Sequence, residues 1–196
     1  MISKLAKSIA HFFVVQNITE ESKEVIYAYG MELLISDVLN TIIVLLIALF
    51  SHTLPAVVVF IAVFMGLRQF VGGFHANSHL SCMFTLVMVM MVFSYGICNV
   101  SGHITPIFSI SFIMIALPII LCIAPVPHPN KPMSEEKSVK LRKRSCILAV
   151  TLSVVTIALL VFQYQKLSLY VSSGMLLSAI MALLGHFLNR GDNSNR

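Results

Sequence analysis

The chain is a series of long apolar runs separated by short polar segments, and this alternation is what most restricts its fold. A helix that crosses a membrane needs about 20 mainly apolar residues. Six runs approach or reach that length, and they cover residues 31–51, 54–70, 80–100, 105–124, 146–164 and 167–188. The sequence therefore predicts an all-α, polytopic membrane protein with six transmembrane helices in a single domain, residues 1–196.

Composition and charge placement agree with this prediction. Only 11% of the residues are charged, whereas a soluble domain has about 25%. If the N-terminus is cytoplasmic, twelve of the thirteen lysines and arginines lie on that side and only Lys166 lies outside. By the positive-inside rule both termini are then cytoplasmic in a multi-pass cell-membrane protein. The net charge of +5 thus predicts contact with anionic lipid headgroups, not with nucleic acid.

The first 28 residues differ from the spans because charged residues alternate with Ile, Phe and Val. This pattern predicts helices at the membrane interface. Asn17 and Thr19 provide a break, with Thr19 as the expected N-cap of a second short helix that begins at Glu20. We do not expect a removable signal peptide, since no small-residue cleavage site follows the first lysines.

A polar segment between the second and third runs holds the candidate chemistry. It contains Arg68, the glycine pair Gly72 and Gly73, two histidines and Cys82. Ionisable groups at membrane depth are costly and usually mark function. Histidine accepts a proton near neutral pH, and a neighbouring thiol becomes a nucleophile once it loses one. The segment therefore indicates a membrane-embedded cysteine endopeptidase.

Cys82 is the best candidate nucleophile because it falls in the first turn of the third span. The partial positive charge of a helix N-terminus favours the thiolate there. Cys98, Cys122 and Cys146 have fewer such neighbours in sequence, and Cys98 and Cys122 lie inside apolar runs. The four cysteines form no CxxC pair and no metal-ligand spacing, so we expect neither a metal site nor a disulfide framework.

The spacing leaves two candidates for the base. His79 lies three residues before Cys82 and would be its neighbour on a helix. His75 lies seven residues before it, about 10 Å away along a straight helix, beyond the hydrogen-bond reach of about 3 Å. His75 can serve only if the chain bends, which Gly72 and Gly73 make easy. Spacing favours His79 and periodicity does not decide.

Three motifs resemble the accessory gene regulator B (AgrB) family. They are the Arg-x3-Gly-Gly-x-His-Ala-x5-Cys pattern from Arg68 to Cys82, Tyr29-Gly30-x-Glu32, and Ala124-Pro125 followed by Asn130-Lys131-Pro132. The resemblance implies a Gram-positive quorum-sensing enzyme that removes the C-terminal tail of a short AgrD-like precursor peptide. A thioester to the enzyme and cyclisation to a thiolactone or lactone would follow, without a cofactor.

The resemblance also implies residue roles. Cys82 would be the nucleophile and His75 the general base, while Arg68, Gly72 and Gly73 would support them. His79 would then be an interfacial neighbour.

Further charged residues are candidates for substrate binding. Glu32 and Asp37, in the cytoplasmic half of the first span, could orient His75 or contact the substrate; snorkelling or a helix–helix hydrogen bond is the alternative. The loop 125–145 is either a solvated connection or a docking surface for an acidic segment, and a short helix after Ser134 would lead into the fifth span. Its basic residues are Lys131, Lys140, Arg142, Lys143 and Arg144.

Two other functional classes fit the apolar pattern. A small multipass transporter or channel would export a peptide without proteolysis and use the segment from Arg68 to Cys82 as a gate, with Asp37 as a pathway charge. No internal repeat supports it. A non-catalytic membrane scaffold is the second rival, and a homodimer is a candidate assembly for any of the three.

Overall fold

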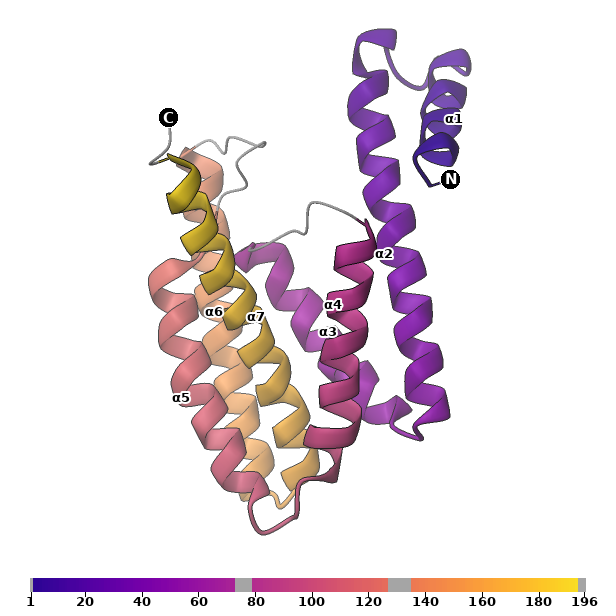
Figure 1. The fold of residues 1–196 in the computed structure, drawn as a ribbon. Helices are drawn as coiled ribbons and strands as arrows, with labels where there is room; N and C mark the ends of the chain where they lie inside the picture. Colours follow the sequence, from indigo (N-terminus) through magenta and orange to yellow (C-terminus); the bar gives the residue numbers. More distant parts are fainter. Residues whose placement is uncertain (1, 73–78, 127–134, 194–196) are drawn as a thin grey trace.

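The computed structural model describes residues 2–72, 79–126 and 135–193, with side chains at 33, 37, 79–83, 86 and 188–193 left out. Within these ranges its regular elements are all helices, which are joined by short turns (Figure 1). In chain order the elements are α1 (Ile2–Val15), η1 (Glu21–Lys23), α2 (Glu24–Phe50), α3 (Leu54–Val71), α4 (His79–Met91), η2 (Val92–Gly96), η3 (Ile97–Asn99), α5 (Thr105–Ile123), α6 (Glu135–Val161) and α7 (Gln165–Asn193).

The predicted all-α membrane fold is confirmed. Five helices among the described residues are long and apolar enough to cross a membrane: 21–50, which includes α2, then α3, α5, α6 and the segment 165–187 of α7. The expected span 80–100 is not one regular helix. It consists of α4, a π-helical turn η2 and a 3-10 turn η3, so the count of six spans stays a prediction.

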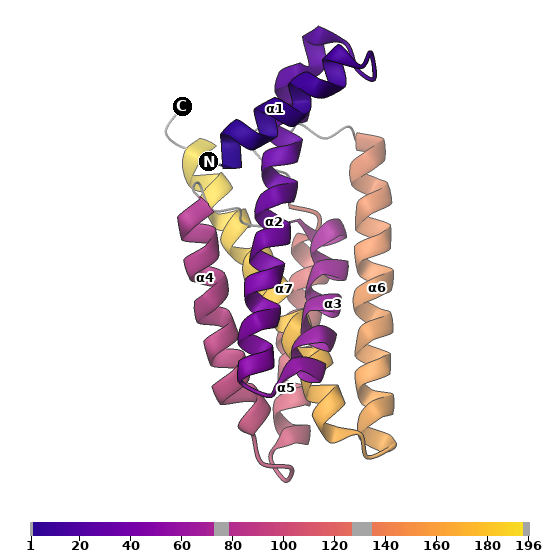
Figure 2. The same ribbon diagram turned by 90° about the vertical axis from the view of Figure 1, so that its right-hand side faces the viewer.

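Helix α7 is the centre of the bundle, and small residues on it let its neighbours approach closely. At Gly174 an added Cβ would lie 2.9 Å from the backbone oxygen of Phe60 in α3. The Ser109 and Ser168 hydroxyls, both buried, are 3.1 Å apart between α5 and α7. Small residues and short hydroxyl hydrogen bonds are the usual means of packing helices in lipid. Figure 2 shows α7 behind α2 and α3, with α6 at the edge.

Helices α2 and α4 pack beside α3 through an apolar cluster that also includes η2. Phe93 of η2 is buried and stacks on Phe60 of α3, with ring centroids 4.3 Å apart. The Asn99 side-chain amide donates to the carbonyls of Ser94 and Tyr95 at 3.3 and 3.0 Å. These bonds satisfy groups in the distorted turn, and we attribute the irregular helix after α4 to this local packing.

The N-terminal region differs from the prediction. Helix α1 is separate, and the short helix expected from Glu20 corresponds to η1, which begins at Glu21 and is followed directly by α2 at Glu24. Thr19 is not the cap: Glu20 precedes η1, without a side-chain capping bond. The reason is that α1 packs along α2. Ala6 and Ala10 are fully buried, and Phe13 meets Tyr27 edge-on at 6.2 Å. The interfacial location of α1 stays a prediction.

Candidate functional site

The described part of the Arg68-to-Cys82 motif lies at one end of the bundle. The C-terminal ends of α3 and α5 and the N-terminal ends of α4 and α6 all lie at the end that also bears α1 (Figure 1). Arg68, Gly72 and Cys82 therefore share this end with the basic start of α6. The common end follows from the alternating directions of the helices, as the sequence predicted.

Arg68 lies in the last turn of α3 and is half-buried. Its guanidinium carbon is 5.4 Å from the centroid of the Phe64 ring, one helical turn earlier. An aromatic face attracts a cation at this distance, so Phe64 restricts where the guanidinium can point. The Arg68 carbonyl accepts a hydrogen bond from the Gly72 amide at 3.0 Å, which closes the last turn of the helix.

Gly72 ends α3 in a conformation that other residues avoid, with φ 74° and ψ −151°. An added Cβ would lie 2.5 Å from the carbonyl oxygen of Val126. The Val126 amide donates to the Val71 carbonyl at 2.9 Å, and Gly72 and Val126 form an isolated parallel β-bridge. The helix end at Gly72 thus has a defined partner, the chain that follows α5.

The nucleophile candidate lies in the first turn of α4, which begins at His79 and reaches Cys82 as its fourth residue. This agrees with the predicted backbone position, although the side chains of both residues are outside the description. His75 and Gly73 lie outside the described residues altogether. The choice between His75 and His79 therefore stays a prediction at this point.

Helix α2 carries a buried polar stripe that faces its neighbours. Ser36 and Asn40 are only 9% and 8% exposed. They continue the four-residue spacing of Val44 and Ala48, which are buried in a cluster with residues of α3, α4 and η2. Glu32, one turn earlier, is half-buried. The stripe extends from Glu32 into the bundle; Asp37, whose side chain is not described, lies on the same helix.

Residue counting places Asn40 close in depth to Cys82. The hydroxyls of Thr53 and Ser94 are 3.2 Å apart, so the start of α3 and the start of η2 are level at the opposite end. Twelve residues before Ser94, or about 18 Å of helix, is Cys82. Twelve residues before His52, in the α2–α3 turn, is Asn40. Helices α2 and α4 run in the same direction (Figure 1).

The basic residues after position 135 lie on helix, not loop. Helix α6 begins at Glu135, as expected, but continues without a break to Val161. Arg142, Lys143 and Arg144 are exposed, while Lys140 donates to Glu136 at 2.6 Å. Lys131 lies outside the described residues. Figures 1 and 2 show α6 and α4 on opposite sides of α3 and α7, so a ligand that touches both must cross the end of the bundle.

Two residues at this end were not selected from the sequence. Asn40 is a polar residue inside the first apolar run, and that polarity is a signal that could have been used. Val126 carries no such signal, because its contribution is a backbone amide next to Val71. Among the described residues, no group of three or more His, Cys, Asp or Glu side chains could hold a metal ion.

Comparison with known proteins covers most of the chain, including the residues described above. The family model for accessory gene regulator B matches residues 3–182, from α1 to the last third of α7. A Clostridium beijerinckii protein described as a putative AgrB-like protein is 25% identical over 145 residues, which cover 72% of this chain and 71% of the relative. No solved structure matches. The chain, with its helical membrane fold and its Arg68-to-Cys82 motif, belongs to the AgrB family.

Proposed function

We propose that this protein is a membrane cysteine endopeptidase. It removes the C-terminal tail of a short AgrD-like precursor and promotes cyclisation of the remainder to a thiolactone or lactone signal. AgrB proteins are peptide-processing enzymes of quorum sensing, which supplies the reaction class and a precursor peptide as partner. The proposed cysteine endopeptidase mechanism rests on Cys82 as nucleophile and His75 as general base.

One observation carries the proposal. The Gly72–Val126 bridge fixes the backbone of the motif at the end of α3, and Cys82 of the same motif lies in the first turn of α4. The partial positive charge of that helix terminus favours a thiolate. Arg68 and Cys82 therefore share one end of the molecule, and the short sequence between Gly72 and α4 supports the assignment of His75 to the same site.

The chemistry is acyl transfer. His75 takes the Cys82 proton, and the thiolate attacks a carbonyl of the precursor. The peptide C–N bond breaks, His75 returns the proton to the leaving amine of the tail, and a thioester joins the precursor to Cys82. A thiol or hydroxyl within the bound peptide then attacks the thioester, which closes the ring and restores the Cys82 thiol. Exclusion of water by the helices favours ring closure over hydrolysis.

Orientation and substrate class follow from charge. We infer that the end with α1 and the motif faces the cytoplasm, because the lysines and arginines gather there. The exposed Arg142, Lys143 and Arg144 suit an acidic segment of the precursor. Glu32, Asp37 and Lys131 are further candidates for substrate contact. The end of the bundle between α4 and α6 is the path across which such a peptide would lie.

The direct test is Cys82→Ala in a cell that also expresses the precursor. We expect the shortened peptide to fall at least about a thousandfold, since a lost nucleophile removes the covalent route. Mass spectrometry of the native protein with a slowly processed precursor should find the N-terminal part of the peptide as a thioester on Cys82.

The matched control replaces Cys98, Cys122 and Cys146 together by alanine, and should retain processing. A shortened peptide from Cys82→Ala at the native rate would overturn the protease proposal. If the native protein instead delivered the uncut peptide to the medium, the transporter alternative would replace it. Absence of both cleavage and covalent capture in the native protein would favour a scaffold.

A second prediction concerns the basic start of α6. Changing Lys140, Arg142, Lys143 and Arg144 to glutamate should lower kcat/KM for the precursor about tenfold or more at low salt, because charge steers association. The loss should shrink as salt is added, and alkylation of Cys82 should keep its native rate. The control is Glu135→Lys with Glu136→Lys at the same helix end, which should not weaken processing. Unchanged kinetics in a folded charge-reversed protein would remove the docking surface.

A further inference from the structure

We propose that Val126 is a positioning residue for the reaction. Its backbone amide fixes the end of α3 from which the segment with the general base departs. This inference rests on the proposed function and extends it to Val126, in the chain that follows α5.

The first step is the hydrogen bond that Val126 makes. The last four carbonyls of a helix have no partner within it. The Val126 amide satisfies one of these in α3 by donating to Val71 at 2.9 Å. In return, the Val126 carbonyl occupies the space that the missing Cβ of Gly72 leaves. The two backbones therefore fix each other on both sides of Gly72.

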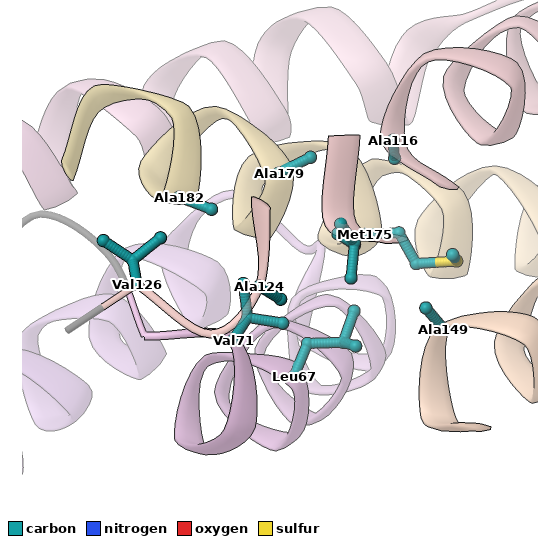
Figure 3. Packing of buried hydrophobic residues seen from close by; sticks show 10 residues of the cluster. Leu67, Val71, Ala116, Ala124, Val126, Ala149, Met175, Ala179 and Ala182 are labelled. Carbon is teal, nitrogen blue, oxygen red and sulfur yellow. The ribbon is translucent and has the colours of Figure 1, made fainter. Parts of the chain in front are cut away.

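The second step is that residues 124–126, which pair with the end of α3, are themselves held in place by packing. Val71, Ala124 and Val126 are 0%, 2% and 5% exposed. Figure 3 shows them beside Ala179 and Ala182 of α7. The stretch 124–126 is thus part of the core. It transmits the positions of α5 and α7 to the end of α3.

The third step is the short reach from this point to the base. Three residues separate Gly72 from His75, which allows at most about 10 Å of extended chain. A displacement of Gly72 therefore moves the point to which the base is tethered. A misplacement of about 1 Å in a catalytic constellation can cost about a hundredfold in rate. The Val126 amide should accordingly matter for turnover more than for binding.

The test uses the full-length protein in liposomes with the precursor peptide. Val126→Pro removes the amide hydrogen and keeps apolar bulk, whereas the control Val126→Ala keeps the amide and removes buried methyl groups. We expect Val126→Pro to lower kcat about 10- to 100-fold with KM within about threefold. Val126→Ala should lower the thermal midpoint but keep kcat within about threefold of native.

A second readout reports the nucleophile directly. In a background without Cys98, Cys122 and Cys146, alkylation of Cys82 should slow in Val126→Pro to the same extent that we expect for His75→Ala. If Val126→Pro does not fold, the α-hydroxy acid analogue of valine can be introduced at position 126 by nonsense suppression. It replaces the backbone N–H by an ester oxygen, keeps the side chain, and should give the same result.

Three outcomes would overturn the inference. Native kcat in the folded proline or hydroxy-acid variant is the first, and unchanged Cys82 alkylation there is the second. The third is an equal loss of kcat in Val126→Ala, which would indicate a merely structural contribution. Cys82→Ala is assayed in parallel: if it retains processing, the protease proposal itself fails. If it loses processing while the Val126 variants do not, only the present inference fails.

Discussion

Replacing His75 by alanine should lower kcat for precursor cleavage about 10²- to 10⁴-fold, which is the usual contribution of a positioned general base. Replacing His79 should change it no more than a few-fold. The two histidines are four residues apart and lie on the same polar segment. They differ in that α4 begins at His79, whereas His75 belongs to the chain that leaves the Gly72–Val126 bridge.

The measurement is single-turnover formation of the thioester with purified protein in liposomes, alongside the rate of Cys82 alkylation. Both rates should fall in His75→Ala and stay near native in His79→Ala. Added imidazole should restore part of the lost rate in the first variant and have no effect on the second. The reverse pattern, with His79 essential and His75 dispensable, would return the assignment to the one that helical spacing favours.

Gly72→Ala should destabilise the protein by about 2–4 kcal/mol. The backbone region near φ 74° and ψ −151° is almost exclusive to glycine and costs other residues about 1–3 kcal/mol. The new methyl group would also lie 2.5 Å from the Val126 oxygen, a backbone atom that can retreat only by moving the end of α5. Overpacking of this kind adds about 1–3 kcal/mol.

The matched control is Gly66→Ala in the same helix. Gly66 is helical, and an added Cβ there would meet no atom within 4 Å, so stability should stay equal or rise. Thermal unfolding in detergent should show a midpoint about 10 °C lower for Gly72→Ala only. An alanine at position 72 that unfolds at the native temperature would mean that the bridge can rearrange without cost, which would also weaken the argument for Val126.

Much of the helical pattern could be predicted from the sequence because lipid leaves the backbone few choices. The predicted start of the second span at residue 54 and of the fourth at 105 agree with α3 and α5, each of which has a proline in its first turn. Polar boundaries were predicted less well. Helix α2 begins well before the predicted residue 31, because α1 packs on its first turns and supports them.

The candidate site was predictable as a set of residue types but not as an arrangement. The Arg68-to-Cys82 motif indicated a thiol, a base and a bend, and Cys82 does occur in the first turn of α4. The sequence did not indicate that the end of α3 is held by Val126, since a backbone amide leaves no mark in residue type. It also did not indicate that α4 and the basic start of α6 lie on opposite sides of α7.

The sequence by itself determined the class of fold, the approximate limits of most spans and the family, because each depends on local hydrophobicity or on motif spacing. Only the tertiary structure decided which helix ends meet: α3 with the chain after α5, α2 beside α4, and α7 in the centre. Such meetings depend on how closely backbones can approach. That distance is set by a missing Cβ at Gly72 or Gly174 and by the atoms that face it from residues 126 and 60, far away in the chain.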